Sequence, residues 1–327
     1  MEGSGLKLPK LRHSVGVEIE QDRAFVTGAT GTHTLFFPSD GQVALGRLFD
    51  DLRAGGIACE ELERRHPDID GLPDLIGQLD GLHLLTESEF AVPEGTISGA
   101  QLDRVVHRMA RRQQQKLASS RFQALLVDDS ATHRQLVGYA LEYFWLVRAA
   151  PALIAPAIAT AADLRLRARL QEFLASELNH DRYLLSALKA AGIVGDLTAL
   201  QPLPTTFRIC ASLGAYAQQH PLSFLAALFL FEQAQPAFIE AFERRCIAIG
   251  LPKAFYAPLR QHSTINDEAD HGAISTELLS LVPAVILEEQ VVVKRNMAVL
   301  VETMVQQESE ILDYYGDPDR PFPRLFS

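Results

Sequence analysis

Charged and imidazole side chains recur inside segments whose remaining pattern is that of buried helices. Glu142 and Glu232 each lie in an otherwise apolar helical run, and Glu177 and His180 lie three residues apart in another helical segment. Burying a carboxylate is costly unless it is paired with a cation or bound to a metal. We therefore expect these groups to share one metal centre inside a helical bundle.

The types of side chain in this set indicate which metal it suits. Glu177 and His180, on a helix expected over 162–192, would project from nearly the same face. Together with Glu142 and Glu232 they supply three carboxylates and one imidazole, a mixture that suits iron or manganese better than zinc. Di-iron sites in helical bundles use single glutamates and Glu-x-x-His pairs.

A late segment, expected to be helical over 254–282, carries three further candidate ligands. Asp267 and His271 are four residues apart and share a helix face, whereas His262 is nine residues from His271 and falls on the opposite face of a regular helix. A π-bulge would bring His262 to the same side. We expect His262, Asp267 and His271 to complete the centre, with Glu268 as the alternative carboxylate and a surface position as the alternative for His262.

The overall composition restricts the kind of protein. The chain has 327 residues, of which 47% are hydrophobic and 22% charged, as in ordinary globular proteins. We expect no membrane span and no secretory signal, because no sufficiently long charge-free apolar run is present. The net charge of −11 argues against a nucleic-acid partner. The three cysteines lack metal-ligand spacing, which favours reduced thiols and a cytoplasmic protein.

The period of the hydrophobic pattern changes along the chain and divides it into two parts. The first part is expected to contain strands within 15–37, helices at 43–52, 60–66 and 72–79, and a strand at 82–86. The second is expected to contain helices at 102–117, 132–150, 162–192, 221–249, 254–282 and 284–313. Residues 1–90 are therefore predicted to form a small winged-helix-like α+β domain, and residues 91–327 an all-α bundle of about seven helices.

In their order, the candidate ligands resemble those of the haem-oxygenase-like di-iron oxidase and oxygenase superfamily, whose relatives include thiaminase II and pyrroloquinoline-quinone synthase. Its metal-binding members carry a Glu, a second Glu often with a nearby His, a further Glu, and a late His-x-x-x-Asp-x-x-His run. Residues 100–313 follow this order, and 176–192 is the most specific stretch, but the late groups are spaced at five and four. The resemblance implies a seven-helix bundle, two ferrous irons per chain with one as the alternative, dioxygen as a substrate, and a homodimer.

Residues 14–86 resemble the peptide-recognition domain of ribosomal-peptide maturation, the fold of the pyrroloquinoline-quinone peptide chaperone. The resemblance depends on the order of strands and helices and on the segment 48–62 followed by 72–85. Such domains bind a leader peptide as an added strand between a sheet edge and the third helix. The implied peptide-binding residues are Thr32, Thr34, Phe36, Leu72 and Leu75. A packing domain that binds no peptide is the alternative.

These features together predict an iron-dependent oxidase or oxygenase that acts on a peptide or on a small amine or amino acid in a biosynthetic pathway. Hydroxylation, oxidative C–C or C–N cleavage and N-oxygenation are all compatible with it. A metal-free quinone-forming oxidase and a non-catalytic peptide-binding scaffold are the alternatives. Thiaminase-type hydrolysis would need a nucleophile such as Cys210, and haem degradation an early histidine such as His107 or His133.

Overall fold

The structure is a computed structural model, and it divides into two compact units. It describes residues 5–38, 41–88, 93, 95–117, 121–194, 200–232, 236–268 and 273–324, without the side chains of 116, 117 and 263–268. Met1–Arg104 and Ser280–Val291 form the N-terminal unit, and Val105–Leu279 and Val292–Ser327 form the helical unit. An isolated antiparallel bridge between Ile97 and Val285 ties the two segments of the N-terminal unit together.

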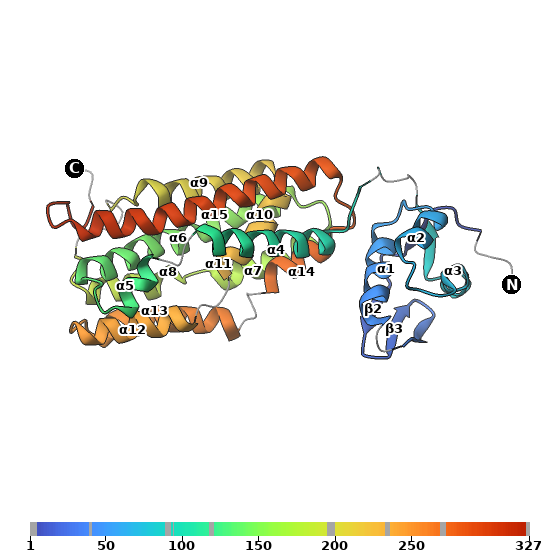
Figure 1. Ribbon diagram of the computed structural model, residues 1–327, viewed down its shortest axis with the longest axis horizontal. Helices are drawn as coiled ribbons and strands as arrows, with labels where there is room; N and C mark the ends of the chain where they lie inside the picture. The colour runs from blue at the N-terminus through green and yellow to red at the C-terminus, as the bar shows by residue number, and fades with distance from the viewer. Residues whose placement is uncertain are drawn as a thin grey trace. The chain divides into compact units, whose positions relative to one another are not determined.

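The N-terminal unit combines two small antiparallel sheets with three short helices (Figure 1). Its elements are β1 Pro9–Leu11, β2 Gly16–Ile19, β3 Arg23–Gly28, β4 Gly31–Phe36, α1 Gln42–Ala54, α2 Cys59–Arg65, α3 Leu72–Gly81 and β5 Leu85–Glu87. The strand order is β2-β3-β4 in one sheet and β1-β5 in the other, so β4 is an edge strand. The expected strands and three helices are present, although the returning strand is confined to β5.

The alternation of side chains along β3 and β4 determines which face of the larger sheet is buried. Ala24 and Val26 of β3 are fully buried against the hydrophobic core that includes Leu48 and Phe49 of α1. The register pairs Phe25 with Thr34, and both therefore lie on the other face of the sheet. This face is the more exposed one in β4.

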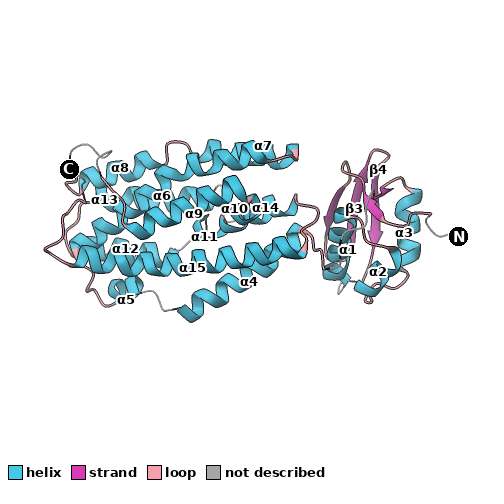
Figure 2. Cartoon of the chain, turned by 90° about the horizontal axis from the view of Figure 1, so that it is seen from above, coloured by secondary structure: helices cyan, strands magenta, loops and turns pink. Residues whose placement is uncertain are grey.

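The helical unit is all-α (Figure 2). Its elements, with α4 and α15 counted here, are α4 Gly99–Leu117, α5 Arg121–Val127, α6 His133–Thr160, α7 Leu164–Glu177, α8 Asp181–Ala190, α9 Pro204–Gln219, α10 Pro221–Ala227, α11 Phe229–Glu232, α12 Pro236–Ala248, α13 Lys253–Glu268, α14 Ile274–Ser280 and α15 Leu287–Gly316. The predicted class, a small α+β domain with an all-α bundle, is confirmed.

Helix α6 is the long helix around which this unit is organised, because it packs against α7, α8 and α9. It begins with a capping box between Thr132 and Gln135, and it continues through Pro151 and Pro156, ten residues beyond the predicted end at 150. By length and composition α6 could cross a membrane, and α10–α12 pass the same test together as a bent pair. Core helices of water-soluble bundles share these properties, so the observation is weak evidence for a span.

Several helical predictions need correction. The segment expected as one helix over 221–249 comprises α10, α11 and α12, and the segment expected over 254–282 comprises α13 and α14. The segment expected as one helix over 162–192 is broken between α7 and α8, where Asn179 has a φ of 70°. Asparagine visits this left-handed region more readily than most residues, which is why the break can occur there. Helix α9 was not indicated by the sequence pattern, although it buries Ile209, Leu213 and Ala217 along one face.

Candidate metal centre

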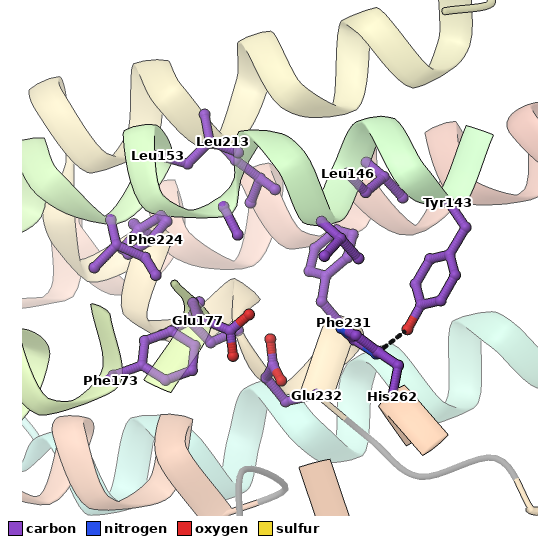
Figure 3. Close-up of a pocket in the computed structure, with 14 residues that line it drawn as sticks. Tyr143, Leu146, Leu153, Phe173, Glu177, Leu213, Phe224, Phe231, Glu232 and His262 are labelled. Atoms are coloured by element: carbon purple, nitrogen blue, oxygen red, sulfur yellow. Dashed lines mark hydrogen bonds between the residues drawn. The ribbon is translucent and has the colours of Figure 1, made fainter. Parts of the chain in front are cut away.

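A mainly apolar cavity lies inside the helical unit between α6, α7, α9, α10, α11 and α13 (Figure 3). Its volume is about 80 Å³, on a scale where one water molecule needs roughly 10–15 Å³. Its polar lining residues are Tyr143, Glu177, Glu232 and His262. Its apolar lining residues are Leu146, Val147, Ala150, Leu153, Ile154, Phe173, Leu213, Phe224, Leu228 and Phe231. Three of the predicted ligands therefore meet in one cavity.

Glu177 and His180 lie on the two sides of the break between α7 and α8. Glu177 is the last residue of α7 and is 4% exposed, and His180 directly precedes α8 and is 7% exposed. The Oε2 atom of Glu177 lies 3.3 Å from Nδ1 of His180. The two groups are therefore neighbours, as the Glu-x-x-His spacing predicted, but a turn rather than a continuous helix brings them together.

His262 of α13 is the imidazole at the other end of the cluster. It is 2% exposed, and its ring lies edge-on to that of His180 with 5.0 Å between the ring centroids. The hydroxyl of Tyr143 is 2.9 Å from Nδ1 of His262. Burial, with smaller contributions from nearby Tyr139, Glu232 and Glu177, raises the pKa of Tyr143 well above its usual value, so this phenol is protonated at neutral pH. If Nδ1–H donates to the phenol oxygen, Nε2 is the nitrogen that can bind a metal.

Glu232 ends α11 and brings a second carboxylate to the cavity. The carboxylates of Glu177 and Glu232 point toward one another in Figure 3. If both carboxylates are ionised, their charges repel in this largely apolar cavity, and a cation between them would remove that repulsion. Among the residues that the structure describes, however, no group of three or more His, Cys, Asp or Glu side chains is already set at metal-binding geometry.

Glu142 does not line the cavity, and the structure does not bring it together with the other predicted ligands. Its Oε1 accepts a hydrogen bond from the Tyr315 hydroxyl at 2.7 Å, and its Oε2 accepts one from the Leu203 backbone N–H at 3.0 Å. Thr206 contributes a further side-chain hydrogen bond, while burial raises the pKa of the Glu142 carboxyl. Neighbouring positions on a helix point about 100° apart, so Tyr143, not Glu142, faces the cavity.

The remaining predicted ligands fall where the structure gives no side chains. Asp267 and its competitor Glu268 belong to the last turn of α13, and their side chains lie outside the described residues. His271 lies outside the described residues altogether. The described backbone of α13 is α-helical from Lys253 to Glu268 and shows no π-turn up to that point. The parts assigned to Asp267 and His271 stay predictions.

The predicted peptide-binding residues of the N-terminal unit divide into two groups. Thr32, Thr34 and Phe36 are exposed along the edge strand β4, and Phe36 is 78% exposed. Leu75 is partly buried, and Leu72 is a core residue with 2% exposure. Leu72 is therefore unsuited to contact a ligand, because it packs inward at the start of α3.

The side chains considered for thiaminase-type hydrolysis and for haem degradation have surroundings that do not favour these reactions. Burial raises the pKa of the Cys210 thiol to about 11, which disfavours a nucleophilic thiolate. His107 packs against the ring of Phe229 with 4.0 Å between the ring centroids. Neither residue belongs to the cavity lining.

Comparison with known proteins gives a fold for the bundle. No family model and no curated protein matches the sequence. A domain of unknown function with a heme oxygenase-like fold from Shewanella denitrificans has a TM-score of 0.55 and 20% identity, covering 69% of this chain and 98% of that one. The bundle has a haem-oxygenase-like fold. A TenA homolog from Pseudomonas syringae also matches it, with a TM-score of 0.54 and 12% identity over 64% of this chain and 92% of that one.

Proposed function

We propose that the chain is an iron-dependent oxidase or oxygenase whose haem-oxygenase-like bundle holds ferrous iron in the cavity. The observation that carries the proposal is that Glu177, Glu232 and His262 line one mainly apolar cavity, with His180 in contact with Glu177. Two carboxylates and two imidazoles from separate segments suit iron, while the absence of thiols among these four groups does not favour a structural zinc site. The donor chemistry of these residues, rather than a preformed geometry, therefore supports the proposed metal.

Glu177, His180, Glu232 and His262 would hold the iron. Asp267 and His271 are the proposed ligands for a second ion, and Glu142 is left out of the set because its oxygens accept hydrogen bonds elsewhere. Bound iron supplies the redox chemistry with dioxygen.

The protein's own residues prepare that centre. Tyr143 fixes the orientation of the His262 ring through its hydrogen bond to Nδ1, as the outer partners of ligating histidines usually do. The mainly apolar lining lowers the local polarity, which strengthens electrostatic interactions inside the cavity.

The N-terminal unit is proposed to bind the leader part of a peptide substrate. Its edge strand β4 exposes Thr32, Thr34 and Phe36, and an unpaired strand edge can accept an added strand. Binding there would raise the local concentration of the reactive segment at the cavity. The proposal for the bundle does not depend on this step, because a free small amine or amino acid could enter the same cavity.

Metal analysis tests the proposal. Full-length protein from iron-supplemented cells should carry about one to two irons per chain, the range implied by one or two bound ions. Glu177→Ala should lower the iron content to background, whereas Glu142→Gln should keep it, which makes the latter a matched control for removal of a buried carboxylate. Wild-type protein that contains no iron and takes up no ferrous iron anaerobically would refute the proposal and favour a metal-free oxidase or a peptide-binding scaffold.

A further inference from the structure

The cavity has two walls of different chemistry. Figure 3 shows Leu146, Leu153 and Leu213 on one side, with the carboxylates of Glu177 and Glu232 on the other. The first wall comes from α6 and α9, and the second from α7 and α11, with His262 of α13 beside it. A molecule inside the cavity therefore meets hydrocarbon on one side and the proposed iron ligands on the other.

The apolar wall is long because α6 lines the cavity over three helical turns. Its lining positions run from 143 to 154 with the spacing of one helix face, and eleven residues of helix correspond to roughly 16 Å. Ala150 lies in the middle of this stretch and, as a small residue, leaves space there. The wall is long enough to contact an extended chain of several carbon atoms.

The charges of the described lining residues limit what can bind. These residues include no lysine or arginine, and their only carboxylates are Glu177 and Glu232. Neither carboxylate belongs to the α6–α9 wall. A substrate carboxylate that packs against this wall would find no cationic side chain there, and an ammonium group would find no carboxylate. Burying either charge without a partner is costly.

We infer that the group that enters the cavity is an uncharged hydrocarbon, aliphatic or aromatic, which packs against the α6–α9 wall with its reacting carbon toward Glu177 and Glu232. The orientation toward iron rests on the proposed function, whereas the preference for hydrocarbon rests on the wall alone. The hydrocarbon belongs either to a free small molecule or to the side chain of a peptide.

Titration calorimetry with a series of neutral amides tests the inference on the full-length chain. Hexanamide, heptanamide and octanamide should bind with dissociation constants that fall about fourfold for each added methylene, the factor that corresponds to about 0.8 kcal/mol. Affinity that does not depend on chain length would overturn the inference.

Two matched variants locate the binding. Ala150→Phe fills the middle of the wall and should weaken octanamide binding at least tenfold, whereas Ala152→Phe places the same side chain at an exposed position of α6 and should not. If Ala150→Phe does not fold, Leu146→Gln, which adds a polar group to the wall, should weaken binding in the same way. Wild-type affinity in a folded wall variant contradicts the assignment.

Repeating the titrations with and without ferrous iron, under anaerobic conditions, separates this inference from the proposed function. A chain-length dependence in protein that takes up no iron would leave the hydrocarbon site standing and refute the metal centre. Iron uptake without any chain-length dependence would support the metal centre and refute the hydrocarbon site. A capped tripeptide with norleucine that binds more tightly than hexanamide would identify a peptide side chain as the source of the hydrocarbon, and the opposite order would identify a free small molecule.

Discussion

The hydrogen bond from Tyr315 to the buried Glu142 allows a direct test of whether this carboxylate is stabilised by hydrogen bonds or belongs to the proposed metal centre. Glu142 is 1% exposed, and the 2.7 Å bond from Tyr315 is one of the few interactions that compensate for its burial. Hydrogen bonds to charged groups contribute about 1.5–3 kcal/mol. Tyr315→Phe should lower the free energy of unfolding by about this amount and Tm by about 3–12 °C, at 2–4 °C per kcal/mol for a domain of 150–250 residues.

The same variant should leave the iron content unchanged, because neither Tyr315 nor Glu142 lines the cavity. Calorimetric melting and metal analysis of one preparation measure both effects, with Glu177→Ala as the variant that should lose iron. If Tyr315→Phe loses iron as completely as Glu177→Ala, the separation of Glu142 from the proposed metal centre is refuted. Melting at the wild-type temperature would instead refute the stabilising contribution of the hydrogen bond.

The pH dependence gives an independent check on Glu142. Burial raises the pKa of its carboxyl above the ordinary value of 4.5, so the folded chain binds this proton more tightly than the unfolded chain does. The contribution of Glu142 to stability is therefore largest below about pH 4.5 and decreases as the pH rises toward the folded pKa. The free energy of unfolding of the wild type, relative to Glu142→Gln, should fall over this interval in denaturant titrations. A relative stability that rises instead would contradict the assigned direction.

Three further predictions concern other parts of the helical unit. Gly138→Ala should destabilise the protein by about 1–3 kcal/mol in denaturant melts, because a Cβ at this position would lie 2.2 Å from the Tyr315 ring, although Ala for Gly in a helix normally stabilises. Tyr143→Phe should weaken iron binding about 10–100-fold in anaerobic chelator competition, since it removes the partner of His262; unchanged affinity would show that the hydrogen bond does not tune the ligand. Cys210, whose pKa is raised to about 11, should resist iodoacetamide at pH 8 in folded protein and react after unfolding in urea, as followed by mass spectrometry.

The sequence predicted most of the elements because their hydrophobic periods are clear. The three helices of the N-terminal unit have regular apolar spacing and end at glycines or turns, as at Gly55, where φ is 70°. The break at Asn179 could not be predicted, because the residues around it also fit a helical pattern. Helix α9 was missed even though Pro204 occupies its first turn, a common position for proline in helices.

The candidate site was predictable in part for a physical reason. The charge of an acidic residue in an apolar helix must be compensated, but the sequence does not show which group compensates it. Glu177 and Glu232 meet in the cavity, whereas Glu142 accepts hydrogen bonds from Tyr315 and Leu203, which are far away along the chain. Tyr143 faces the cavity but was not assigned as a site residue, because a tyrosine in an apolar helix more often packs in the core.

The turn between α7 and α8 has a mechanical consequence for the pair of donors on its two sides. On a single helix, the separation of Glu177 and His180 would be fixed by the helical rise and rotation. Here it depends on the angle between two helices joined at Asn179. A tilt of a few degrees in one helix would change the distance between the two side chains while every helical hydrogen bond stays intact. If the pair binds the proposed iron, this joint would let it adapt to ions of different radius without unfolding.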